Sequence, residues 1–116
     1  MEQRADYAEE PDPERVVVRV LQPGETVHVR ARALAGVIAV TDHRLLVAER
    51  TRLALEIPLG EVRRIEFDIE RTRPATLVIV PEHPAQEPQV LAIPLAELSR
   101  AVAALSFIGE RIAGTE

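Results

Sequence analysis

The sequence predicts a small α+β domain, built mainly from antiparallel β-strands and closed by one C-terminal helix. Its 116 residues are the length of one typical domain. Hydrophobic residues make up 47% of the chain, but there is one Tyr, two Phe and no Trp, so the core must consist of Val, Leu, Ile and Ala. Short apolar segments are joined by loops too short for crossover helices, which favours antiparallel pairing.

Residues 1–13 are predicted to form an acidic, flexible tail that precedes a domain of residues 14–116. Six acids against Arg4 give residues 1–14 the whole net charge of −5, so the rest of the chain is neutral. A segment of this composition stays mobile and solubilises the domain. The alternative is that it folds back onto arginine-bearing faces of the domain or docks on a partner.

A short helix is predicted over residues 13–21, because Asp12 is a good N-cap and Pro13 is favoured in the first turn. Seven strands follow it, each marked by apolar alternation or by a continuous apolar run. They cover residues 27–33, 37–41, 45–49, 53–57, 62–71, 75–80 and 89–93. In the fourth, Leu53, Leu55 and Ile57 are expected to share one face.

The last segment changes to a helical period. Apolar residues recur at steps of three and four, and Gly114 follows the last of them. The residues predicted to face the core are Leu95, Leu98, Val102, Leu105, Ile108 and Ile112. One amphipathic helix therefore covers an open end of the sheets.

Three stretches are similar to bacterial pleckstrin-homology-like (PH-like) domains. They are Leu21-Gln22-Pro23-Gly24-Glu25-Thr26-Val27, Val40-Thr41-Asp42-His43-Arg44-Leu45-Leu46, and Ile57-Pro58-Leu59 ahead of residues 62–65. The resemblance covers residues 14–113 and implies a seven-stranded, partly open barrel capped by a C-terminal helix. In the turn at residues 41–44, Asp42 is expected to accept from downstream amides, and Arg44 to reach a carboxylate across the hairpin.

Exposed arginines are the candidate site for an anionic partner. Arg30 and Arg32 share the outward face of the first strand, and Arg50 and Arg52 lie in the turn before the fourth. Resemblance to eukaryotic PH domains implies inositol phosphate binding by basic residues on the first two strands and their loop. The second strand, residues 37–40, supplies none of these.

Catalytic chemistry is not expected. The chain has no Cys, which excludes thiolate chemistry, and all 14 of its basic residues are Arg, which excludes a lysine Schiff base. Its three His lie in separate elements, so they are not expected to share a metal ion. The carboxylates of Glu66, Asp68 and Glu70 could bind a cation or act as acid and base. They are expected instead to form a solvated face paired with arginines on neighbouring strands. We predict no enzyme, no cofactor and no metal.

Two functions remain open. The first is a cytoplasmic interaction module that binds a protein partner or a second copy of itself, for example by strand addition at a sheet edge. The alternative is weak peripheral binding to anionic membranes through Arg30, Arg32, Arg50 and Arg52. Nucleic acid is not an expected partner because the body of the chain is neutral. The acidic N-terminus does not resemble a signal peptide, which is consistent with the cytoplasm.

Overall fold

The computed structural model describes residues 12–114, so most of the predicted acidic tail lies outside the described residues. The helices are α2 (Pro13–Val20) and α3 (Leu98–Gly114), with short 3-10 helices η1 (Leu59–Glu61) and η2 (Leu95–Glu97). The strands are β1 (Val27–Arg32), β2 (Gly36–Thr41), β3 (Arg44–Glu49), β4 (Arg52–Pro58), β5 (Val62–Glu70), β6 (Arg73–Pro81) and β7 (Gln89–Ile93). The predicted short helix, seven strands and terminal helix are therefore confirmed.

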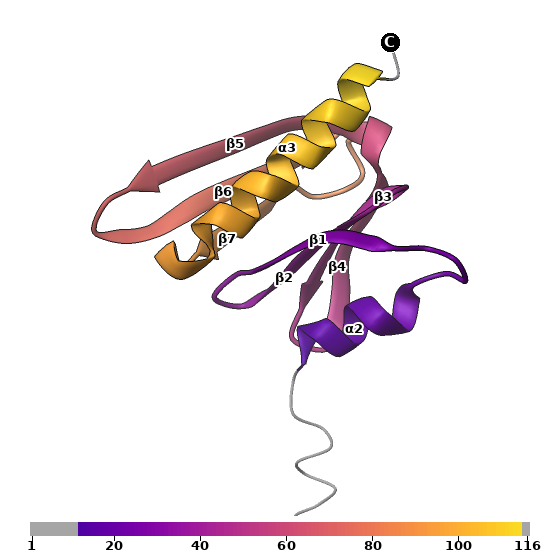
Figure 1. Cartoon of the computed structure of the whole chain (residues 1–116), viewed down its shortest axis with the longest axis horizontal. Helices are drawn as coiled ribbons and strands as arrows, with labels where there is room; N and C mark the ends of the chain where they lie inside the picture. The colour runs from indigo at the N-terminus through magenta and orange to yellow at the C-terminus, as the bar shows by residue number, and fades with distance from the viewer. Residues whose placement is uncertain (1–11, 115–116) are drawn as a thin grey trace, which may run out of the picture.

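The strands form two antiparallel sheets, one in the order β1-β2-β3-β4 and one in the order β5-β6-β7. Figure 1 shows the sheets splayed apart, with α3 across them and α2 on the other side of the first sheet. At one corner the backbone N–H of Leu34 donates to the carbonyl of Ala92 at 2.8 Å and joins the β1–β2 turn to β7. The barrel is thus partly open, as predicted, and β1 and β4 end the four-stranded sheet.

The central strands β2 and β3 are buried on both faces. Ile38, Val40, Leu45 and Val47 point into the main core between the sheets, together with residues of β6, β7 and α3. On the opposite face, α2 places Val16 and Val17 against a second apolar cluster that includes Val37, Ala39, Leu46 and Ala48. Because α2 covers this face, both strands read as continuous apolar runs in the sequence.

The prediction that Leu53, Leu55 and Ile57 share one face is wrong. The register shifts between Val47 and Ala48, so that Leu55 pairs with Val47 whereas Leu53 pairs with Ala48. The extra residue forms a β-bulge, which reverses the alternation. Leu53 therefore packs with α2, while Leu55 and Ile57 enter the main core.

The predicted face of the terminal helix is only partly correct. Ile108 is buried, but Leu95 and Val102 are 44% and 45% exposed. Leu95 belongs to η2 rather than to α3, so it does not continue the helical period. The buried residues of α3 are Ile108 and the small Ala101 and Ala104.

Candidate functional site

A buried charged cluster centres on Arg44 at the start of β3, which has 8% of its surface exposed. Its Nε and Nη2 each donate to the carboxylate of Glu25 at 2.8 Å, and Nη2 also donates to the carbonyl of Val20 at 2.6 Å. Its Nη1 donates to the carboxylate of Glu56 on β4. The prediction that Arg44 reaches a carboxylate is confirmed, but its partners precede β1 and lie on β4 rather than across the β2–β3 hairpin. Its contacts tie the segment after α2 to β3 and β4.

The Arg44 guanidinium also sets the charge state of Glu25, whose side chain is only 2% exposed. Hydrogen bonds from Arg44 lower the pKa of Glu25 from 4.5 to about 2, against the opposing effect of burial. The same pair raises the pKa of Arg44 above its ordinary value. Each charge in this cluster is paired with an opposite charge of the same chain. The cluster therefore stabilises the fold and is not a ligand site.

Thr41, not Asp42, organises the turn between β2 and β3. The Thr41 hydroxyl oxygen accepts from the backbone N–H groups of His43 and Arg44, at 3.1 and 3.0 Å, and its O–H donates to Glu25 at 2.7 Å. Asp42 instead faces His43, with 3.4 Å between Oδ2 and Nε2. The hydroxyl takes this role because Thr41 is fully buried beneath the turn.

The structure divides the four candidate arginines into two pairs. Arg30 and Arg32 lie side by side on β1, where both approach the Glu14 carboxylate of α2, at 3.5 and 2.6 Å. Arg52 starts β4 at the opposite edge of the sheet, three strand spacings or about 14 Å from β1. Its guanidinium is 3.5 Å from Glu49, and the neighbouring Arg50 is in the turn. The four residues do not converge on one ligand.

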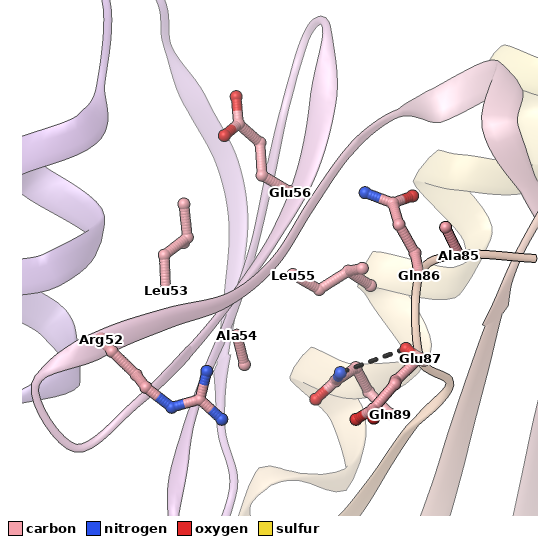
Figure 2. Close-up of a pocket in the computed structure, with 9 residues that line it drawn as sticks. All are labelled: Arg52, Leu53, Ala54, Leu55, Glu56, Ala85, Gln86, Glu87 and Gln89. Atoms are coloured by element: carbon pink, nitrogen blue, oxygen red, sulfur yellow. Dashed lines mark hydrogen bonds between the residues drawn. The ribbon is translucent and has the colours of Figure 1, made fainter. Parts of the chain in front are cut away.

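A pocket of about 390 Å³ lies between β4 and the loop that precedes β7. Figure 2 shows residues of β4 facing residues of this loop, whose own shape is supported by a hydrogen bond from Gln89 to the carbonyl of Glu87 at 3.2 Å. The lining residues are Arg52, Leu53, Ala54, Leu55, Glu56, Ala85, Gln86, Glu87 and Gln89. Five of them are consecutive residues of β4.

Consecutive lining residues show that the pocket lies along the edge of β4. Successive side chains of a strand point to opposite faces, so a pocket on one face would contact every second residue. The backbone N–H of Leu59 donates to the carbonyl of His43 at 3.1 Å. Because antiparallel pairs alternate, Leu55 and Ile57 bond to β3, whereas the N–H and C=O of Glu56 point away from it. The pocket therefore exposes backbone groups that are available to another strand.

Sequence reasoning missed this pocket. No residue type marks it, because it depends on β4 being the last strand of its sheet and on where the distant residues 85–89 fold. Glu25 was also missed as a partner of Arg44, although it lies within the first PH-like stretch. The sequence signal that could have found Glu25 is Arg44 itself, because a buried arginine needs a carboxylate partner and Glu25 is an acid within a PH-like stretch.

The histidines and the acidic residues of β5, which the sequence raised as possible site residues, contact other side chains or the backbone of the domain. His28 stacks on Phe107 at 4.8 Å between ring centroids, and His83 accepts from the N–H of Ala85 through Nδ1 at 3.1 Å. On the predicted acidic stripe, Glu66 and Glu70 pair with arginines at 3.1 and 2.8 Å. Among residues 12–114, no cluster of three His or acidic side chains could hold a metal ion, and no helix is long and apolar enough to cross a membrane.

Two antiparallel sheets, an unclosed barrel and a C-terminal helix define a PH-like fold. No protein-family profile matches the sequence, and no curated protein matches it significantly. Similarity is found among solved structures instead, at low sequence identity, and it bears out the predicted resemblance to bacterial PH-like domains.

Two of these structures come from species of Shewanella. A DUF1696 family protein with a pleckstrin-homology domain from Shewanella loihica has a TM-score of 0.61 and 13% identity, over 89% of this chain and 95% of that one. A pleckstrin-homology domain from Shewanella amazonensis also has a TM-score of 0.61, with 14% identity over 88% of this chain and 99% of that one. At such identities the likeness concerns the fold.

Proposed function

We propose that this domain is a non-catalytic, cytoplasmic interaction module that binds an extended segment of a protein partner, or of a second copy of itself, along the free edge of β4. The observation that carries the proposal is the pocket formed by consecutive residues 52–56 of β4, by residues 85–87 of the loop and by Gln89 at the start of β7. An extended segment placed there adds a fifth strand to the sheet. Main-chain hydrogen bonds supply affinity without requiring a sequence motif in this domain.

The lining chemistry supports a peptide occupant. Glu56 directs its backbone N–H and C=O into the pocket, while its carboxylate is held by Arg44. The amides of Gln86 and Gln89 stand across from the strand and can donate or accept. Polar groups of both kinds on opposite walls suit the backbone of an extended chain.

Binding to an anionic membrane through Arg30, Arg32, Arg50 and Arg52 has less support. An exposed arginine near such a surface contributes about 1 kcal/mol, but the first two already share the Glu14 carboxylate. The other pair lies across the sheet. No single surface therefore collects all four charges.

The test fills the pocket and leaves the strand intact. Ala85→Trp places an indole in the pocket, whereas Ala103→Trp makes the same change on the exposed surface of α3. Peptides selected from a displayed random library on the native chain are expected to bind Ala103→Trp normally and to lose at least tenfold in affinity for Ala85→Trp. Binding-induced shifts of amide resonances should centre on residues 52–56.

Light scattering at rising protein concentration, on the same three chains, reports self-association through the same edge. Loss of a concentration-dependent dimer in Ala85→Trp alone supports a second copy as the occupant. A mass of one chain at every concentration together with no selected peptide contradicts the proposal. Flotation with phosphatidylglycerol vesicles that disappears in Arg30→Ala plus Arg32→Ala supports the membrane alternative instead.

A further inference from the structure

The other edge of the four-stranded sheet carries a basic pocket. It has a volume of about 370 Å³ and is lined by residues 27–30 of β1 and by Arg100 of α3. Its lining again includes consecutive strand residues, so it follows the edge of β1 rather than one face. Among residues 12–114, no acidic side chain lines it, whereas Arg30, Arg100 and His28 do.

The backbone of β1 shows how this edge receives a carboxylate. The N–H of Arg32 points away from β2 and donates to Oε1 of Glu97 at 3.0 Å. Arg30 pairs with Ala39 two positions earlier in the same register, so its N–H also points outward, into the pocket. Glu97 thus accepts from one outward amide of β1, and the next outward amide belongs to Arg30, which lines the pocket together with Arg100.

The pocket contains one guanidinium group, that of Arg100, whose charge is not compensated by a carboxylate of the described residues. Among the described residues, no carboxylate lies within 4.0 Å of the Arg100 guanidinium, and Arg100 is exposed. Arg30 has one contact, 3.5 Å from its Nε to Glu14. Two guanidinium groups beside an outward amide are suited to one or two carboxylates, which arginine binds with paired, charge-assisted hydrogen bonds.

An acidic segment of the same chain begins close to this pocket. Residues 1–11 contain four acids, Glu2, Asp6, Glu9 and Glu10, against Arg4, for a net charge of −3. They join the domain at Asp12, two residues before Glu14, which contacts Arg30. Eleven residues span up to about 36 Å when extended and about 18 Å as a flexible coil. The pocket is within this reach.

We propose that residues 1–11 bind along the β1 edge, with their carboxylates on Arg100, Arg30 and the backbone N–H of Arg30. The segment is an intramolecular ligand that covers this edge of the sheet. Its attachment keeps it at a millimolar effective concentration, so that a weak contact suffices for occupancy. The proposal concerns β1 and is independent of partner binding at β4.

The experiment compares the native chain of 116 residues with the triple variant Asp6→Asn, Glu9→Gln, Glu10→Gln of the same chain by ¹H–¹⁵N NMR. The native chain is expected to show displaced amide signals for residues 27–30 and a displaced Nε–Hε signal for Arg100. Both signals should approach the variant's positions as salt is raised, because salt screens the attraction. The matched control Glu66→Gln, Asp68→Asn, Glu70→Gln removes the same charge from β5 and should leave the pocket signals unchanged.

A second variant separates the contact from a general charge effect. In an Arg100→Gln background, neutralising residues 6, 9 and 10 should change the signals of residues 27–30 at least threefold less than in the native background. Arg100 is exposed on α3, so this variant should fold normally. Identical signals for residues 27–30 and for the Arg100 side chain in the native and neutralised chains overturn the proposal. So do shifts of undiminished size in Arg100→Gln, or shifts that centre on Arg50 and Arg52.

Discussion

Replacing Glu25 by Gln tests the buried ion cluster that fastens the sheet. The native pKa of Glu25 is about 2, against 4.5 for the same group in water. Each pKa unit corresponds to about 1.4 kcal/mol, so a shift from 4.5 to about 2 gives at most about 3.5 kcal/mol of stabilisation at pH 7, and about 2 kcal/mol after a discount for solvent screening. The variant also weakens the hold on Arg44, which then keeps Glu56 as its partner.

The pH dependence gives the sharper criterion. Because the pKa of Glu25 is lowered on folding, its contribution is complete above about pH 5 and is lost as the pH falls towards 2. Urea unfolding should show Glu25→Gln to be less stable than the native chain by about 2 kcal/mol at pH 7 and by roughly half as much at pH 3. Glu66→Gln, which removes an exposed pair with Arg64, should change stability by less than about 0.5 kcal/mol. Equal effects of the two variants at pH 7, or a Glu25 effect that does not change with pH, would refute the reasoning.

Three further substitutions test backbone and packing, each by urea unfolding. Gly36→Ala should lower the free energy of unfolding by at least about 2 kcal/mol, because the added Cβ would lie 2.3 Å from the Ala48 carbonyl oxygen on the neighbouring strand. An unchanged stability would mean that β2 and β3 can move apart at little cost in free energy, contrary to this reasoning. Arg50→Gly should be neutral or stabilising by up to about 1 kcal/mol, since Arg50 has a φ of 53°, where a side chain is disfavoured; marked destabilisation would point to an unrecognised role of the guanidinium. Leu45→Ala should cost about 2–5 kcal/mol from its fully buried position, and a cost below about 1 kcal/mol would contradict the described core.

The sequence predicted most of the elements because local patterns determine them. The N-cap at Asp12, which accepts from the N–H of Glu14 at 3.2 Å, and the turn at Gly24, where φ is 81°, are determined by residue type alone. The alternation in β5 is equally local. The partner of Arg44 could be anticipated in kind, as a carboxylate, from the turn motif.

Tertiary structure decided what no local pattern contains. The bulge that turns Leu53 towards α2 depends on the register of β4 against β3, and the burial of Ala101 and Ala104 in place of Leu95 and Val102 depends on how α3 crosses the sheets. Both open edges, the β4 pocket and the basic β1 pocket, exist because these two strands end a sheet and distant segments fold beside them. Local sequence sets the backbone conformation of a few residues. A strand lies at the edge of a sheet when no other strand pairs with one of its sides, and this pairing depends on how the whole chain folds.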